Sequence, residues 1–389
     1  MFTSLRWIAV FLLLWLGGCA VVPPARPPVT PPPPPAAVLQ PADWPQLPGW
    51  TDNDALAAWP AFLAGCGPLK KQPAWQPVCA AAAQFTPTDD AGARAFFQQW
   101  LLPYRLTTSD GNDTGLITGY YEPLLFGSRT PSARYRFPLY GVPDDLLDID
   151  LASLYPELKK YRLRGRLAGR RVIPYYTRAE IDAGRAPLQG KALLWVDDAV
   201  DLFFLQIQGS GRVQLEDGTV IRVGYADQNG QPYTSIGKML VAQGALPLEQ
   251  ASMQGIKQWG MQNPEKLPAL LDSNASYVFF RELPPSSTPD SGPPGALGVS
   301  LTGGRSLAVD PRSVPLGSPV YLATTWPNSA QPLNRLMLAQ DTGGAIKGVV
   351  RADFFWGFGA DAAQRAGSMR QQGRMWVLLP KGAKNATPD

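Results

Sequence analysis

The chain is organised around a stretch in its C-terminal third that reads Leu336-Met-Leu-Ala-Gln-Asp341-Thr-Gly-Gly-Ala-Ile-Lys347-Gly348. An apolar run that ends in an acidic residue and two glycines predicts a buried strand that stops at a turn. The glycines allow a positive φ or the close approach of a ligand to the backbone. Taken alone, Asp341 is more simply explained as a residue that orders its own turn, and Lys347 has no assigned function. The rest of the chain has to decide between these readings.

Composition limits the chemistry that this chain can perform. The 389 residues are 45% apolar and 17% charged, enough for two globular domains, and the net charge of +4 does not indicate a nucleic-acid partner. Histidine is absent from the sequence. Catalysis by Ser-His-Asp or Cys-His groups and metal sites built on imidazole are therefore excluded, and carboxyl groups become the first candidates for acid-base work.

The N-terminus predicts a lipid anchor. Residues 1–18 have the basic residue and short apolar core of a signal peptide, and Leu16-Gly-Gly-Cys19 resembles the bacterial lipobox. The resemblance implies lipidation of Cys19, which would hold the protein on a membrane. Ala20 in the second position implies the periplasmic face of the outer membrane. The alternative is an ordinary signal peptide with an accidental cysteine.

A proline-rich tether and a cysteine pair follow. Residues 19–41 are rich in proline, and such a segment predicts an extended spacer of about 3.1 Å per residue. Cys66 and Cys79 enclose a loop short enough to close in an oxidising periplasm, which predicts a disulfide. Two unrelated buried thiols are the alternative.

The expected elements change in kind along the chain. Residues 42–110 read as helical, with N-caps at 52–54 and 88–90, and helices return over 235–272 with Ser235 as a cap. Period-two and β-branched patterns predict many short strands between and after these helices, with a hairpin turn at 216–219 and a Pro/Gly-rich loop at 282–296. The predicted strands cover 115–122, 193–196, 203–208, 212–215, 220–223, 277–281, 320–322, 336–338 and 376–379.

Three aspartates lie at predicted strand ends in the C-terminal third: Asp310, Asp341 and Asp353. If their strands are neighbours, the carboxyl groups converge, and both burial and mutual repulsion would raise at least one pKa. A carboxyl group that stays protonated near neutral pH can act as a general acid. Three independent turn residues remain the alternative at this point.

Three further segments combine polar groups with aromatic residues or glycines. They are Thr118-Gly-Tyr-Tyr-Glu122, Gln206-Ile-Gln208-Gly209-Ser210-Gly211, which follows a predicted strand, and the run from Tyr225 to Lys238. Such mixtures are typical of carbohydrate clefts, and equally of ordinary strands and hairpin turns. The glycine loop is not a Walker loop, because Gly-Lys-Ser/Thr is missing.

Together, and in this order, these motifs resemble the membrane-bound lytic murein transglycosylase A family, over about residues 42–380. The resemblance implies a mainly β protein with peripheral helices, in which a double-psi β-barrel and a smaller inserted β-barrel border a groove. The barrel would be built from 42–122 and 245–380, the insertion from 123–244, and 381–389 would form a tail. The last part of the chain is similar to the family's three-aspartate module.

The resemblance also implies the site. Asp341 matches the catalytic aspartate, Asp310 and Asp353 match supporting acids, and the matching substrate contacts are Thr118, Gln208, Gly209, Ser210 and Lys238. The family cleaves the β-1,4 bond between N-acetylmuramic acid and N-acetylglucosamine in peptidoglycan, leaving a 1,6-anhydro end. One carboxyl group can serve as acid and then as base, so neither a metal nor a cofactor is required. The expected protein is a monomer that binds glycan strands and partners of cell-wall synthesis or hydrolysis.

Two other classes remain as alternatives. Asp341-Thr342-Gly343 also matches the triplet of aspartic proteases, and those enzymes need two such carboxylates, from a second copy of the triplet or from a dimer partner. The other alternative is a non-catalytic peptidoglycan-binding lipoprotein, because double-psi barrels also occur as binding modules.

Overall fold

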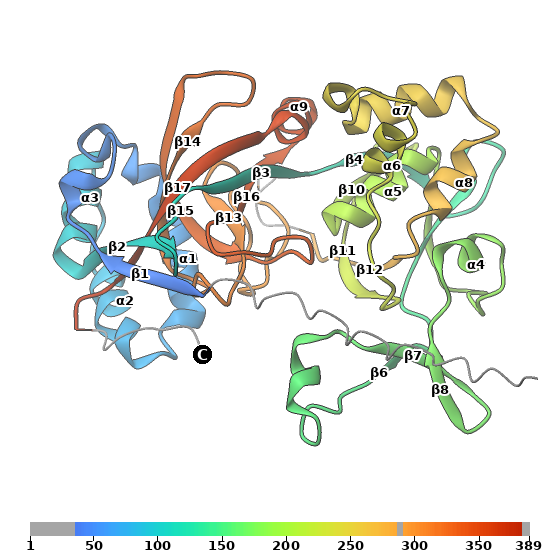
Figure 1. Ribbon diagram of the computed structural model, residues 1–389, viewed down its shortest axis with the longest axis horizontal. Helices are drawn as coiled ribbons and strands as arrows, with labels where there is room; N and C mark the ends of the chain where they lie inside the picture. The colour runs from blue at the N-terminus through green and yellow to red at the C-terminus, as the bar shows by residue number, and fades with distance from the viewer. Residues whose placement is uncertain (1–35, 286–290, 383–389) are drawn as a thin grey trace, which may run out of the picture. The chain divides into compact units, whose positions relative to one another are not determined.

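A computed structural model describes residues 36–285 and 291–382, apart from the side chains of Lys159 and Lys160. Strands dominate, and the helices lie around them (Figure 1). The fold is therefore mainly β with peripheral helices, as predicted. The predicted signal peptide, the lipobox Cys19, nearly all of the proline-rich tether and most of the 381–389 tail fall outside the described residues.

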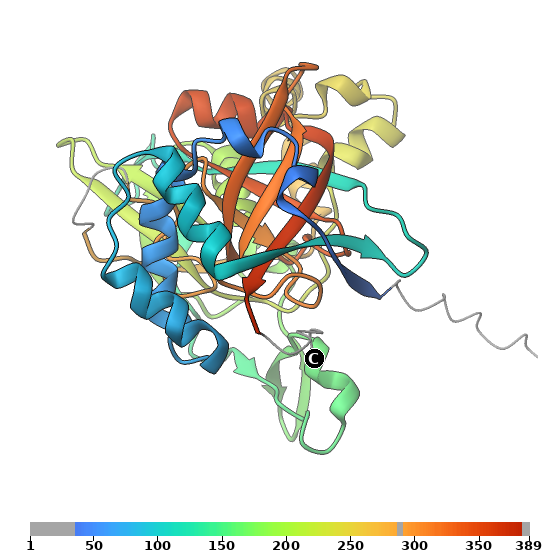
Figure 2. The same cartoon turned by 90° about the vertical axis from the view of Figure 1, so that its left-hand side faces the viewer.

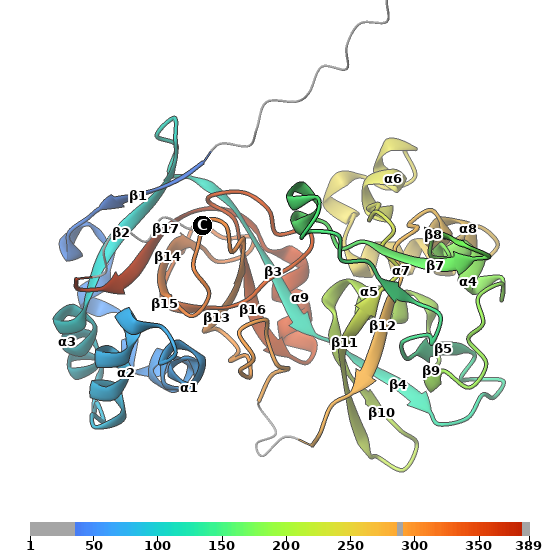
Figure 3. The same ribbon diagram turned by 90° about the horizontal axis from the view of Figure 1, so that it is seen from below.

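The first sheet contains the C-terminal strands together with strands from the start of the chain. Its order is β1-β2-β17-β14-β15-β13-β16-β3, and β3 also pairs with β17. The pairings β17-β14-β15-β13-β16-β3-β17 therefore form a ring of six strands (Figure 3). The bounds are β1 Ala37–Pro41, β2 Leu101–Thr108, β3 Gly115–Glu122, β13 Ser306–Val309, β14 Pro319–Thr325, β15 Pro332–Asp341, β16 Ala352–Phe358 and β17 Arg370–Pro380.

Both faces of β15 are buried, which explains its unbroken apolar run. Leu336 and Leu338 pack in one core with the N-terminal helices, and Met337 and Ala339 pack in a second core formed mainly by the strands of the ring. Alternate residues of a strand point to opposite faces, so each position from Leu336 to Ala339 requires an apolar residue. Helices α1, α2 and α3 cover the outside of this sheet (Figure 2, blue to teal). Their bounds are Trp59–Leu69, Gln76–Ala83 and Asp90–Trp100.

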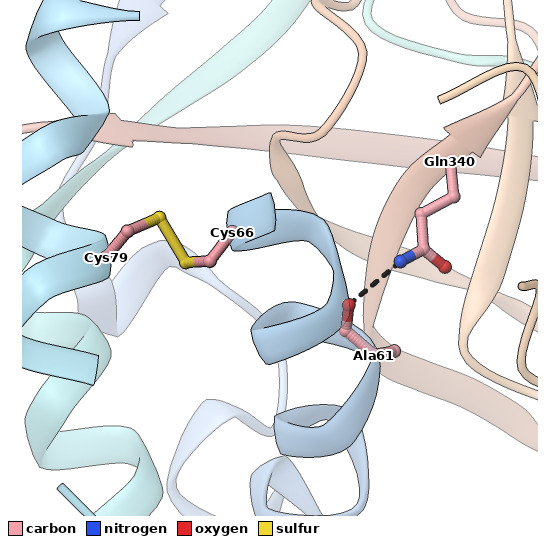
Figure 4. The surroundings of a disulfide bond; sticks show 4 residues. All are labelled: Ala61, Cys66, Cys79 and Gln340. Atoms are coloured by element: carbon pink, nitrogen blue, oxygen red, sulfur yellow. Dashed lines mark hydrogen bonds between the residues drawn. A yellow bond between two sulfur atoms is a disulfide. The ribbon is translucent and has the colours of Figure 1, made fainter. Parts of the chain in front are cut away.

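A disulfide links α1 to α2. Cys66 and Cys79 are bonded, with a Cα–Cα distance of 5.4 Å, as the sequence predicted (Figure 4). On the other side of α1, the Gln340 Nε2 group donates to the Ala61 carbonyl at 2.8 Å. The residue before Asp341 is thereby fixed to the helical layer.

The second sheet has the order β12-β11-β10-β4-β9-β5. Its bounds are β4 Leu124–Ser128, β5 Phe137–Tyr140, β9 Ala192–Val196, β10 Ser210–Gln214, β11 Val220–Gln228 and β12 Val278–Glu282. No ladder joins β12 to β5 among the described residues, so the expected smaller barrel is an open sheet. Helices of the same region are α4 Arg178–Asp182, α5 Ala199–Gln208, α6 Ile236–Ala242, α7 Met253–Gln262 and α8 Leu267–Asp272, and α9 Ala360–Ser368 precedes β17.

The boundary expected at 244/245 differs from the structure. β12 pairs with β11, and α7 and α8 share an apolar core with α5 and α6, so the chain up to Glu282 lies with the second sheet. The sequence carried no sign of this, because a strand pattern does not reveal its pairing partner. A third, small sheet consists of β6 Leu147–Asp148, β7 Arg164–Ala168 and β8 Arg171–Pro174. Short 3-10 helices complete the described chain: Trp44–Gln46, Trp50–Asp52, Ala55–Ala58, Pro73–Trp75, Pro156–Lys160 and Leu248–Gln250.

Two local predictions were wrong. The segment 203–208 is the end of α5, not a strand; Asp198 caps this helix by accepting from the N–H groups of Val200 and Asp201. Its aromatic and β-branched residues favour strands, but packing against α6 to α8 favours a helix. The second wrong prediction is the end of the first helical region, which was expected at residue 110. The helix ends at Trp100, because Leu101–Thr108 is a strand that pairs with β1 and β17.

Candidate active site

Asp341 and Asp353 lie on either side of one strand. The last residue of β15 is Asp341, and Asp353 is the second residue of β16. The strand between them is β13, where Ala308 is in register with Asp341 on one side and with Asp353 on the other. Residues in register on neighbouring strands are close together, so the sheet brings the two carboxyl groups to one place.

Asp353 has the properties of a proton donor. Its Oδ1 accepts from the Thr118 hydroxyl at 2.6 Å, and Thr118 is its register partner on β3. Burial, reinforced by the charge of Asp341, raises the pKa of Asp353 to about 6, against the hydrogen bond from Thr118 and the charge of Arg351. No hydrogen bond to Oδ2 is present within the described residues, so that oxygen is free to carry a proton.

Asp341 is held in a different way, because both of its oxygens accept hydrogen bonds. The Tyr120 hydroxyl donates to Oδ2 at 3.0 Å, and the Ala296 N–H donates to Oδ1 at 3.0 Å. Burial raises the pKa of Asp341, while these bonds and one from the Thr342 N–H favour its ionised form. Burial and the two carboxylates in turn hold the pKa of Tyr120 well above its ordinary value, so the phenol keeps its proton.

Asp310 does not join the pair. Arg312 donates to its carboxylate at 2.9 and 2.6 Å, and the Gly348 N–H donates at 2.9 Å. Burial would raise the pKa of Asp310, but these bonds outweigh it and lower the pKa. Asp310 therefore stabilises the turn that follows Asp341, and the expected convergence of three aspartates holds for two of them.

The other predicted contact residues lie on several elements. Gln208 and Gly209 end α5, where Gly209 adopts a left-handed conformation with φ +79°, and Ser210 begins β10. The Gln208 Oε1 atom accepts from the Tyr121 N–H at 3.2 Å, so this segment contacts β3 beyond Thr118 and Tyr120. Lys238 is exposed on α6, where it lines a shallow pocket of about 420 Å³ with Tyr233, Thr234, Ser235, Met239 and Ala242. Lys347 is exposed and remains without a function.

Sequence reasoning missed the segment that supplies the Ala296 N–H. It is the end of the predicted Pro/Gly-rich loop, to which no part in the site was assigned, and it lies along β15, where the Leu297 N–H donates to the Gln340 carbonyl at 3.0 Å. A Cβ on Gly295 would lie 2.5 Å from the Gln340 carbonyl oxygen, so only glycine permits this approach. Gly295 indicated a close approach of the backbone to another group, but nothing in the sequence showed that the neighbouring strand is the one that carries Asp341.

Two arginines anchor the start of that segment. The Arg222 guanidinium donates to the carbonyls of Ser291 and Gly292 at 3.1 and 2.7 Å. Glu122, whose side chain is fully buried, faces Arg212 at 2.8 Å and Arg222 at 3.9 Å. Burial raises the pKa of Glu122, and the two arginines oppose that rise. This cluster connects β3, β10 and β11 with the segment that holds Asp341.

Two family models match most of the described chain: the MltA specific insert domain over residues 116–281 and the 3D domain over residues 305–379. Membrane-bound lytic murein transglycosylase A of Escherichia coli K12 is 33% identical over 283 residues, 71% of this chain and 68% of that protein. The namesake protein of Vibrio cholerae is 31% identical, over 73% of this chain and 70% of the relative.

Solved structures give the same result. The structure of MltA from Neisseria gonorrhoeae superposes with a TM-score of 0.78 at 40% identity, over 93% of this chain and 99% of that one. LtgG, a lytic transglycosylase of Burkholderia pseudomallei, is 47% identical with a TM-score of 0.61, covering 90% of this chain and all of that one. E. coli MltA has been solved with bound chitohexaose; it is 26% identical with a TM-score of 0.62, over 89% and 94% of the two chains.

The fold and the sequence define an enzyme of the lytic transglycosylase class. The chain belongs to the membrane-bound lytic murein transglycosylase A family. Over residues 36–285 and 291–382 we find no helix long and apolar enough to cross a membrane. The same residues hold no cluster of three or more Cys, Asp or Glu side chains with the geometry of a metal site.

Proposed function

We propose that this protein cleaves the β-1,4 bond between N-acetylmuramic acid and N-acetylglucosamine in peptidoglycan and leaves a 1,6-anhydro-muramyl end. One observation carries the proposal. The carboxyl groups of Asp341 and Asp353 flank Ala308 from the two strands that border β13, and the pKa of Asp353 is raised to about 6. Such a group can give and take a proton near neutral pH. The relatives named murein transglycosylases and the chitohexaose bound to E. coli MltA support the same substrate class.

Asp353 acts first as the acid and then as the base. Its protonated carboxyl group gives the proton to the glycosidic oxygen while the bond from that oxygen to C1 breaks. The muramyl 6-hydroxyl then attacks C1 and closes the anhydro ring. Its proton passes to the Asp353 carboxylate, which restores the starting state without water or a covalent enzyme intermediate. Burial and, to a smaller extent, the negative charge of Asp341 raise the pKa of Asp353 and so favour its protonated form, and the same charge stabilises positive charge at C1 during the reaction.

The sequence-based prediction gave this acid-base role to Asp341 alone. The hydrogen bonds favour Asp353, because both oxygens of Asp341 are occupied as acceptors and one oxygen of Asp353 is not. On β3, Thr118 orients the carboxyl group of Asp353 and Tyr120 orients that of Asp341. We assign Gln208, Gly209, Ser210 and Lys238 to glycan binding, since their polar groups and the pocket beside Lys238 suit a sugar polymer.

We place the protein on the periplasmic face of the outer membrane, held by lipid on Cys19. The lipobox-like motif supports this location, and the E. coli and V. cholerae relatives are named membrane-bound.

Two variants and one analysis of products test the reaction. Asp353→Asn should abolish cleavage of purified murein, and Asp341→Asn should leave a reduced activity whose alkaline limb lies at lower pH. The pKa of Asp353 falls when the neighbouring charge is removed, so the protonated acid is lost at lower pH. Mass spectrometry of the wild-type digest should find anhydro-muramyl ends.

Three results would contradict parts of this account. If Asp341→Asn is inactive and Asp353→Asn retains activity, the roles of the two residues are exchanged. Products with reducing ends would exclude the anhydro mechanism. Binding to murein without turnover by pure protein would favour the non-catalytic alternative.

A further inference from the structure

Residues 147–174, which we call the arm, contain a small sheet whose strands do not pair with either of the two large sheets in the described chain. Its three strands, β6, β7 and β8, pair only with one another among the described residues (Figure 1, green). Arg164 on β7 donates from its Nε to the Oδ1 atom of Asp227 on β11 at 2.9 Å. The guanidinium of Arg166 lies 4.0 Å from the centre of the Tyr176 ring. Polar and cation–π contacts thus hold the arm in place.

The arm has no apolar core of its own. None of its residues belongs to a hydrophobic core of the described chain, although it is rich in Leu, Ile, Val and Tyr. Its exposed apolar side chains are Leu151, Leu154, Tyr155, Tyr161, Leu167 and Val172, with Leu154 exposed by 69%. Exposed apolar side chains that gather in one patch are typical of an interaction surface.

The tip of the β7–β8 hairpin shows this arrangement most clearly. Leu167 and Val172 are register partners, so their side chains lie side by side, and they are exposed by 62% and 52%. Between them lie Arg170, in the turn, and Arg171, at the start of β8, and both are exposed. One short turn thus presents two aliphatic side chains together with two guanidinium groups.

The charge of the chain is concentrated here. Residues 147–174 contain seven basic and three acidic residues, a net charge of +4 that equals the net charge of all 389 residues. A surface that is basic and apolar together is complementary to a membrane interface with anionic lipids. Arginine binds the phosphate groups, and aliphatic side chains enter the boundary of the acyl chains.

We propose that the arm docks onto an anionic phospholipid surface, with Leu167 and Val172 inserted at the headgroup boundary. Murein is also anionic, but a sugar–peptide polymer offers no apolar layer for two adjacent aliphatic side chains. The predicted tether from Cys19 supports the lipid surface, since an anchored chain meets its own membrane at high effective concentration. The inference is independent of the proposed reaction, which takes place at Asp341 and Asp353.

Vesicle binding without the lipid anchor tests the arm directly. Because Pro35–Asp389 forms a compact unit by itself, the experiment uses the chain from Ala20 to Asp389. This protein should sediment with vesicles of phosphatidylethanolamine and phosphatidylglycerol, and far less with phosphatidylethanolamine and phosphatidylcholine. We expect Arg170→Gln/Arg171→Gln and, separately, Leu167→Ser/Val172→Ser to weaken the binding roughly tenfold or more.

Matched controls lie outside the arm. Phe126→Ser removes an apolar side chain with 47% exposure, and Arg185→Gln/Arg281→Gln removes two exposed charges. Both should bind vesicles as the parent chain does, and every variant should digest soluble murein fragments at the parent rate. Equal sedimentation with neutral and anionic vesicles would overturn the proposal. Loss of binding to purified sacculi in the arm variants, without any vesicle binding by the parent, would overturn it in favour of murein as the occupant.

Discussion

At the scale of single residues, the same burial that suits Asp353 for acid chemistry costs stability. Its pKa of about 6 exceeds the ordinary value of 3.8, so the folded chain binds more protons than the unfolded chain between these values. The protonated group therefore stabilises the fold fully below about pH 4, and this contribution is lost as the pH rises through 6. At neutral pH the ionised Asp353 destabilises the folded state.

We predict that Asp353→Asn stabilises the protein at pH 7.5 and has little effect near pH 4. The gain should be about 1–2 kcal/mol, below the value from the pKa difference alone because solvent screens a half-buried group. Asparagine can still accept the hydrogen bond from Thr118. Urea unfolding at the two pH values measures the difference, and an equal loss of stability at both would contradict the buried-acid account.

Tyr120 affects the reaction through Asp341. Tyr120→Phe removes the hydroxyl that favours the ionised form of Asp341, so we expect the pKa of Asp341 to rise and its charge to act less on Asp353. The alkaline limb of kcat/KM should move to lower pH, with roughly tenfold lower activity near neutral pH.

Tyr121→Phe is the matched control for this variant. Its hydroxyl contacts Met253 rather than an aspartate, so the pH profile should keep its position. A Tyr120→Phe enzyme with lower activity and an unmoved profile would assign Tyr120 to substrate contact or packing.

At the scale of elements, the site depends on a segment that no strand or helix pattern marked. The chain from Ser291 to Leu297 is fastened to Arg222 at one end and to β15 at the other, with the Ala296 N–H on Asp341. A backbone donor keeps its position only if the segment that carries it is fixed. The buried Glu122 and its two arginines supply that fixation from β3, β10 and β11.

We predict that Arg222→Gln lowers activity by loosening Ser291 and Gly292. Weaker donation from Ala296 should raise the pKa of Asp341, so the alkaline limb should move in the same direction as in Tyr120→Phe. Arg281→Gln, on the neighbouring strand β12, is the control. A loss of thermal stability in Arg222→Gln with an unchanged pH profile would mean that the cluster only holds the fold together.

At the scale of the whole molecule, the catalytic body and its attachment to the membrane are separate properties. The compact unit Pro35–Asp389 contains every residue of the proposed site, whereas the predicted lipid site lies before it. We predict that Cys19→Ser moves the protein from the membrane fraction to the soluble periplasmic fraction without loss of specific activity on murein. Fractionation followed by immunodetection measures this, and full retention in the membrane fraction would contradict lipidation as the main anchor.

Much of this protein follows from local sequence pattern. The strand at 336–338, the hairpin at 216–219, the caps at Asp89 and Ser235 and the Cys66–Cys79 disulfide are all found where the residues predicted them. Each depends on residues close together in the chain, so short-range periodicity and turn chemistry were sufficient. The segment 203–208 failed because its local preference for strand was overridden by packing in α5.

Only the tertiary structure decided which aspartates meet. The sequence predicted that Asp310, Asp341 and Asp353 are acids at strand ends, but β13 brings Asp341 beside Asp353, and Arg312 with Gly348 keeps Asp310 apart. The elevated pKa of Asp353 likewise depends on burial and on a charge twelve residues away along the chain. Burial and strand pairing are properties of the folded molecule, because they join residues that the sequence separates, and they are what make one carboxyl group of this chain an acid.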